Sequence, residues 1–82
     1  MRMICVKCGK ELKCKKNEVV VEELAGNDSY RIWEADLWEC PKCGTEIIAG
    51  FGLEPITEHF EKDYRKILAQ LREQAKVYQL ES

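Results

Sequence analysis

The pentapeptide Cys5-Val6-Lys7-Cys8-Gly9 has a second copy of the same pattern, Cys40-Pro41-Lys42-Cys43-Gly44. These two copies decide the fold of the chain. Each copy is a C-x-x-C turn followed by glycine, and residues 9–39 lie between Cys8 and Cys40. One C-x-x-C turn alone could be a redox dithiol, but two matched copies at this spacing are typical of a tetrahedral four-thiolate metal site. The sequence therefore predicts one structural Zn²⁺, with Fe as the alternative metal, bound by Cys5, Cys8, Cys40 and Cys43.

The residues around the cysteines suit this role. Gly9 and Gly44 tolerate the positive φ that such a turn needs, and Pro41 fixes φ in the second turn. Four thiolates leave no open coordination position for water, whereas a catalytic zinc keeps one. We therefore expect no enzymatic activity and assign no catalytic residue. His59, the only histidine, is expected at the start of a helix rather than at the metal.

Composition indicates one small domain. With 82 residues and 45% hydrophobic content, the chain is short for a hydrophobic core that is stable by itself. We expect a structural zinc to supply the additional stability. There is no apolar N-terminal segment of a secretory signal, and no apolar run approaches the roughly 18 residues that span a bilayer. We therefore expect a cytoplasmic protein with reduced cysteines, no membrane contact and no evident small-molecule substrate. The fifth cysteine, Cys14, is expected to be a small buried hydrophobic residue.

Charge is nearly balanced overall but separated along the chain. Residues 1–16 hold six basic residues and one acidic residue, residues 17–39 hold seven acidic residues and one basic residue, and the net charge is −2. The lysines near the first turn, with Tyr30, Trp33 and Trp38 for stacking, would suit a nucleic-acid-binding protein. Such proteins are usually more basic, so we expect the lysines to solvate the turn and the tryptophans to form core.

Four short segments of alternating or β-branched residues predict strands. They are residues 12–14, 19–24, 30–39 and 45–51. Residues 25–29 read Ala-Gly-Asn-Asp-Ser, which is turn chemistry, so the second and third segments should pair as a hairpin that ends next to Cys40. These segments together predict a small antiparallel sheet with both metal-binding turns at one end.

The last third of the chain predicts a long helix over residues 56–80. Pro55 suits the first helical turn, because its missing N–H is harmless there. Apolar residues recur at steps of three and four, as a helical stripe requires. They are Phe60, Tyr64, Ile67, Leu68, Leu71, Ala75 and Tyr78. The far part of this helix should extend beyond the sheet, so its apolar side would need a second copy of the chain or another protein.

With these turns, residues 4–52 resemble the zinc-ribbon group, which binds one ion between two rubredoxin-type turns. The resemblance implies a small, metal-stabilised α+β fold, with an antiparallel ribbon sheet followed by the long C-terminal helix. We expect residues 1–52 to form the ribbon and residues 53–82 the amphipathic helix of the same single domain. Zinc ribbons serve many functions, so the resemblance implies the fold and the four ligands but no activity.

Three functions remain open at this stage. The first is a non-enzymatic structural-zinc adaptor that binds a protein partner or, through the helix, forms a homodimer. The second is a nucleic-acid-binding accessory or regulatory protein. The third is a rubredoxin-like iron electron carrier, because residues 37–39, Leu-Trp-Glu, resemble the approach to the second rubredoxin turn. Transcript-cleavage ribbons carry an Asp-Glu pair at the hairpin tip, but this chain has Asn27-Asp28 there.

Overall fold

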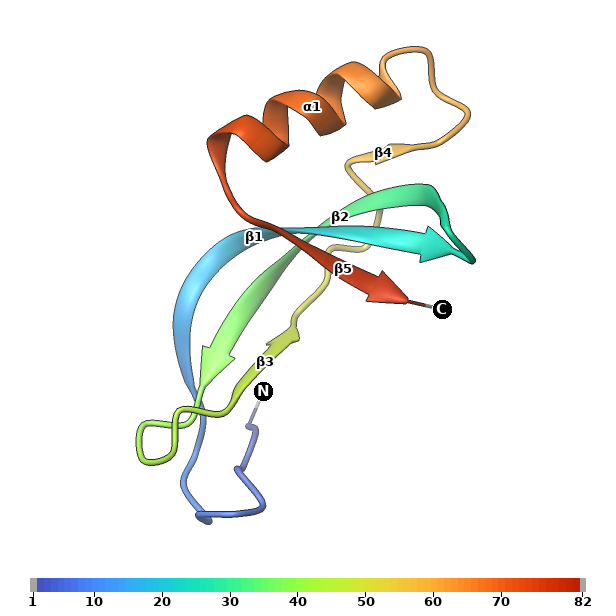
Figure 1. Ribbon diagram of the computed structural model, residues 1–82. Coiled ribbons are helices and arrows are strands. Elements are labelled where there is room, and N and C mark those ends of the chain that lie inside the picture. The colour runs from blue at the N-terminus through green and yellow to red at the C-terminus, as the bar shows by residue number, and fades with distance from the viewer. Residues whose placement is uncertain (1, 82) are drawn as a thin grey trace.

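A bent, mixed sheet makes up most of the computed structural model, which describes residues 2–81 (Figure 1). Strand β2 pairs in antiparallel fashion with β1, β3 and β4, whereas β5 pairs with β1 in parallel. The strand order is β3-β2-β1-β5, and the short strand β4 also pairs with β2. The elements are β1 (Lys13–Ala25), β2 (Asp28–Glu39), β3 (Glu46–Ala49), β4 (Thr57–Glu58), α1 (Tyr64–Gln74) and β5 (Val77–Glu81).

The predicted hairpin is confirmed. Ala25 pairs with Asp28, so the loop between β1 and β2 consists of Gly26 and Asn27. Gly26 has a φ of 67°, and Asn27 is not among the residues with positive φ. Positive φ at only the first loop position is the type II′ arrangement, which matches the right-handed twist of paired strands. Glycine at that position therefore fixes the register of the hairpin.

Strand β1 is one long strand, where the sequence predicted two. Its pairing with β2 shifts register between Lys16 and Val19, which is the pattern of a β-bulge. Glu18 has a φ of 59° there, and its N–H donates to Asp36 Oδ1 at 3.3 Å. Since bulges bend and twist a strand, this one separates the metal end of the hairpin from the part that carries the core (Figure 1).

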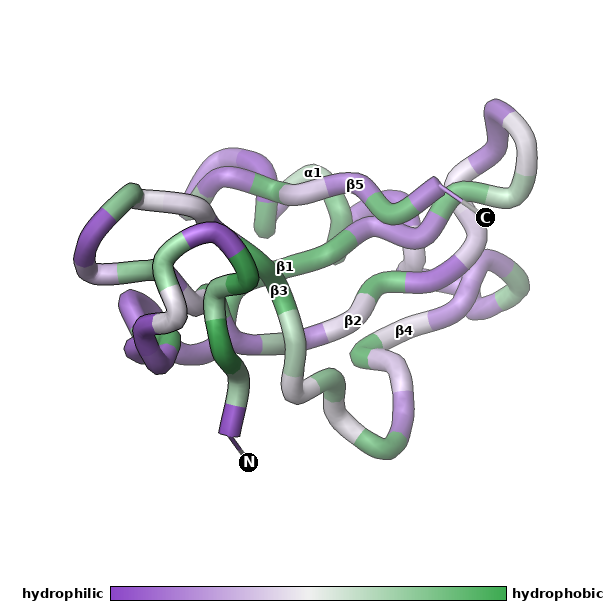
Figure 2. The backbone as a smooth tube through the Cα atoms, turned by 90° about the horizontal axis from the view of Figure 1, so that it is seen from below, coloured by the Kyte–Doolittle hydropathy of each residue, from purple (hydrophilic) through white to green (hydrophobic). Residues whose placement is uncertain are grey.

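The sheet buries side chains on both faces. On one face, Tyr64 and Leu68 of α1 pack against Val20 and Ile32, with Leu71 and Val77 beside them. The other face is the inside of the bend, and its cluster is completed by Trp33, Ile48 and Tyr78. Its buried members are Val19, Val21, Ala35 and Leu37. Figure 2 shows hydrophobic segments in both β1 and β3, and Ile48 of β3 packs against the cluster that contains Val19 and Val21 of β1.

The long C-terminal helix is wrong. Helix α1 covers only Tyr64–Gln74, Ala75 is extended with φ −158° and ψ 167°, and the chain then forms β5. Before α1, the chain follows β2: Ile56 N donates to Ile32 O at 2.7 Å, and β4 pairs with β2. Pro55 therefore lies in a connection and not in the first turn of a helix.

Tertiary contacts explain why the chain forms a strand after Ala75 and does not continue as a helix. A strand that continues past Ala75 puts Val77 and Tyr78 on opposite faces of the sheet, where each joins one of the two core clusters. A continued helix would carry these residues away from the edge of β1. Pairing with β1 also satisfies backbone groups of that edge. The predicted antiparallel ribbon with a long helix is thus corrected to a small, sheet-rich fold with one short helix within residues 2–81.

An ion pair between a buried carboxylate and an exposed guanidinium links α1 to the sheet. Glu22 of β1 is 2% exposed, and its Oε1 accepts a hydrogen bond from Arg72 Nη2 at 2.9 Å. Although burial raises the pKa of Glu22, hydrogen bonds from Ser29, Arg72 and Gln79 lower the pKa below its ordinary value of 4.5. The carboxylate is therefore held in its charged form, and loss of Arg72 alone would leave that charge buried without its cationic partner.

Candidate metal centre

The four predicted cysteines lie together at one end of the molecule. The Sγ atoms of Cys5, Cys8, Cys40 and Cys43 are all within 4.8 Å of one another, and those of Cys5 and Cys43 are 3.7 Å apart. A tetrahedral zinc with Zn–S bonds of about 2.3 Å places its sulfurs about 3.8 Å apart. The cluster thus has the size and donor chemistry of a four-thiolate metal site.

The two turns have the same backbone hydrogen bonds. In the first turn, Gly9 N donates to Cys5 O at 2.7 Å and Cys5 N donates to Lys10 O at 2.9 Å. In the second turn, Gly44 N donates to Cys40 O at 3.0 Å and Cys40 N donates to Thr45 O at 2.9 Å. The φ angles are 69° for Gly9 and 80° for Gly44. The turns are therefore equivalent halves of one site, as the repeated motif predicts.

The hairpin brings these halves together. Lys13 begins β1 just after the first turn, Glu39 ends β2 just before the second, and these two residues pair directly. Leu12, 6% exposed, packs with Cys5 and Cys40 as a third core cluster, and Met3, Cys8 and Trp38 surround it. The strand register thus places two cysteine pairs side by side that are far apart in the sequence.

Local hydrogen bonds favour thiolates in the second turn. The Thr45 hydroxyl lies 3.0 Å from Cys43 Sγ and is the main cause that lowers the pKa of Cys43 to about 6. Backbone N–H groups of Cys43 and then Lys42 lower the pKa of Cys40, against the effect of burial. The hydrogen bond between Cys8 and Cys43 raises the pKa of the Cys8 thiol to about 12. Such N–H and O–H donors also stabilise metal-bound thiolates.

Thr45 is a site residue that the sequence analysis missed. A threonine two positions after the last cysteine is a signal that could have pointed to it, since its hydroxyl can reach the preceding sulfur. Trp38, which the sequence analysis expected in the core, also lies at the site. Its indole N–H is buried and has no hydrogen-bond partner among residues 2–81, although its ring packs beside the cysteines.

Two other predicted residues lie away from the cluster. Cys14 is exposed, and its thiol donates to Asn17 Oδ1 at 3.1 Å, so its predicted burial is wrong. It pairs with Trp38 across the hairpin, near the start of β1, and its side chain is exposed there. His59 is exposed too, and its ring stacks on Tyr30 with 4.6 Å between centroids.

The donor set fits a resident metal ion. Thiolates are soft ligands, and a tetrahedral four-sulfur set accepts both zinc and iron. Cys40 and Cys5 are buried, whereas Cys43 is exposed, so one side of the site faces solvent. Four cysteines would satisfy all the positions of either ion, which is the arrangement of a structural site.

No protein-family model matches the chain, and the searches of curated proteins and of solved structures also gave no match. Among residues 2–81, the structure contains no helix long and apolar enough to cross a membrane. The class of protein is therefore defined by fold and site alone: a small sheet-rich protein with a tetracysteine cluster, consistent with a zinc-ribbon-like motif.

Proposed function

We propose that this chain is a non-enzymatic, cytoplasmic interaction module whose fold is held by one structural zinc ion. The observation that carries the proposal is the closed set of four sulfurs within 4.8 Å at the base of the hairpin. Such a site leaves no coordination position for substrate or water. The same cluster ties the N-terminal turn to the sheet, so its role is to hold the surface in shape.

Exposed apolar side chains support a function in protein binding. The connection between β3 and α1 exposes Phe51, Leu53, Ile56 and Phe60, and the side chain of Leu53 is fully accessible. Single exposed apolar residues are common, but four in one short connection form an apolar surface of the kind that marks interaction sites. Protein association is the function that such a surface supports best.

The strand aromatics favour a protein partner over nucleic acid. Trp33 Nε1 donates to Glu23 Oε1 at 2.7 Å, and Arg31 forms two hydrogen bonds with the same carboxylate. A second carboxylate, that of Glu58, lies 4.0 Å from Arg31. An acidic side chain thus lies beside the Trp33 ring that would stack on a base, and it would repel phosphates. The exposed lysines of the two cysteine turns, Lys7 and Lys42, lie at the other end of β2.

Elemental analysis and affinity capture together test the proposal. We expect one zinc per chain and a colourless protein, whereas a red iron protein with reversible redox would support an electron carrier instead. Capture from native lysate should retain specific proteins on wild-type chain and lose them with Leu53→Glu. The matched control is Gln70→Glu, an exposed charge change on α1. Salt-dependent retention of DNA or RNA, with no protein lost in Leu53→Glu, would refute the proposal.

A further inference from the structure

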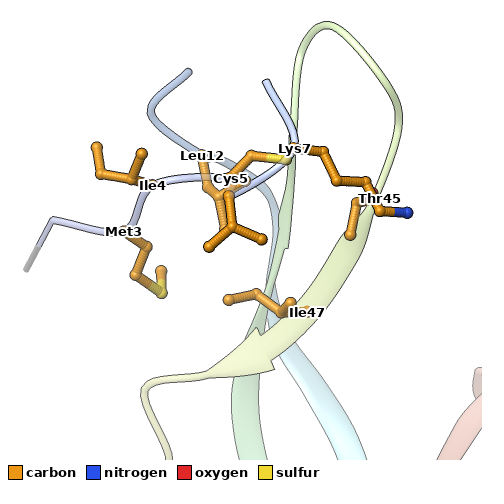
Figure 3. A pocket seen from close by; sticks show the side chains of 8 residues that line it. Met3, Ile4, Cys5, Lys7, Leu12, Thr45 and Ile47 are labelled. Atoms are coloured by element: carbon orange, nitrogen blue, oxygen red, sulfur yellow. The ribbon is translucent and has the colours of Figure 1, made fainter. Parts of the chain in front are cut away.

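An apolar groove of about 370 Å³ opens beside the first cysteine turn. Figure 3 shows Met3 and Ile47 reaching toward each other across it, with Leu12 between them and Lys7 at the rim. Ile4 is 51% exposed and Val6, inside the C-x-x-C turn, is 98% exposed. An almost fully exposed valine at the mouth of an apolar groove is available for contact with another molecule.

The rim of this groove is basic. Lys7 lines the groove, and Lys10, Lys13 and Lys42 are exposed on or next to the same two turns. None of these four lysines forms an ion pair within residues 2–81, whereas Arg2 pairs with Glu11 at 2.9 Å. An occupant with apolar side chains between acidic ones would match both the floor and the rim.

The same chain carries a segment of this chemistry. Residues 51–63 read Phe-Gly-Leu-Glu-Pro-Ile-Thr-Glu-His-Phe-Glu-Lys-Asp, with four acidic residues and one lysine. Leu53 is fully exposed and Phe60 is 70% exposed. Glu54 and Asp63 form no ion pair within the described residues. The segment therefore complements the groove in both hydrophobicity and charge.

A copy cannot place this segment in its own groove. Hydrogen bonds fix it along β2 in the direction of the hairpin tip: Gly52 N to Glu34 O, Ile56 N to Ile32 O, and His59 N to Tyr30 O. The cysteine turns lie at the other end of β2 (Figure 1). The molecule measures 45 × 25 × 21 Å, and the two surfaces lie toward opposite ends of it. Only a second copy can bring them together.

From this complementarity we infer that the chain associates with itself, with residues 51–63 of one copy docked in the groove of the next. The inference rests on the proposed function, because the metal-held turn forms one wall of the groove. The contact joins two different surfaces, so it is heterologous and extends to chains or closes into rings. The lysine rim makes the association stronger at low salt, since the paired charges lie at the surface.

Sedimentation analysis of the zinc-loaded protein tests the inference. The weight-average mass should rise above 9.6 kDa as the concentration increases from about 10 µM to about 1 mM, the range of weak contacts. It should fall again when salt is raised from about 0.05 M to about 1 M. Val6→Glu blocks the groove and Leu53→Glu blocks the segment, so each should weaken association at least about tenfold. Gln70→Glu, with the same change of charge, should behave as wild type.

A mixture of the two disabled variants provides the decisive result. Val6→Glu retains its segment and Leu53→Glu retains its groove, so together they should form a 1:1 complex that does not grow further. A wild-type protein that is zinc-loaded, folded and monomeric at the highest concentration refutes self-association and leaves the metal-held module in place. Failure of the mixture to associate also refutes it. A chain without zinc would instead refute the proposed function, so zinc content and the melting curve of each variant are measured first.

Discussion

Replacing Cys40 with serine should unfold most of this protein at neutral pH. Cys40 is 1% exposed, lies directly after β2 and packs on Cys5 and Leu12. The serine hydroxyl is a hard, protonated group and does not replace a thiolate on zinc. The variant therefore loses both the metal and the link between the two turns.

The magnitude follows from the size of the chain. Structural zinc contributes an apparent 10 to 16 kcal/mol in small zinc-binding peptides, on the order of ten or more here. The whole free energy of unfolding of a native domain is about 5–15 kcal/mol. Outside the metal site, the two core clusters contain only eight buried side chains. The free energy lost with the metal should thus exceed the stability that the rest of the fold supplies.

The assay is a thermal melt followed by far-UV circular dichroism, together with the zinc content of the purified protein. Cys14→Ser is the matched control, because Cys14 is an exposed cysteine outside the cluster and its thiol donates to Asn17 Oδ1. The control should retain one zinc and melt within a few degrees of wild type, since surface substitutions usually change stability by about 0.5 kcal/mol or less.

Retention of metal and of an unchanged melting temperature by Cys40→Ser would refute the reasoning. Loss of zinc in Cys14→Ser would contradict it too, because that result would make Cys14 a ligand. Removal of zinc from wild type with a chelator should reproduce the unfolded state of Cys40→Ser. Added zinc should restore the folded spectrum of the wild-type protein but not that of Cys40→Ser.

Three further predictions concern the sheet, and urea denaturation measures each of them. Trp33→Phe should lower the free energy of unfolding by about 1–3 kcal/mol, because it removes a hydrogen bond to a carboxylate. Trp38→Phe should leave that free energy unchanged or raise it, because the buried N–H of Trp38 has no acceptor among residues 2–81. A larger loss of stability in Trp38→Phe than in Trp33→Phe would refute this reasoning. The pKa of Glu22 lies below 4.5, so its stabilising effect is present above pH 4.5 and is lost as the pH falls through the lower value; Glu22→Gln should flatten that part of the stability profile, and an unchanged profile would contradict it. Gly26→Ala should cost about 1–2 kcal/mol, because φ is 67° at this loop position, and no loss would exclude the turn type described.

The cysteine cluster and the hairpin were predictable because both depend on local chemistry. The two C-x-x-C-G turns of this chain form the same backbone hydrogen bonds, and Gly26-Asn27 joins two strands with a defined register. The register then places Lys13 opposite Glu39 and so brings the two turns together. Thr45 was missed because its contact to Cys43 depends on the side-chain direction after the turn, which spacing does not reveal.

The sequence by itself predicted the cluster of four cysteines and one hairpin, since each follows from contacts within a few residues or from a repeated motif. Tertiary structure decided what residues 56–63 and 75–81 become. Their helical spacing is real, but an edge of β1 that needs a partner and two faces that need Val77 and Tyr78 favour a strand. Local periodicity specifies which residues share a face only after the element is chosen, and here long-range burial made that choice.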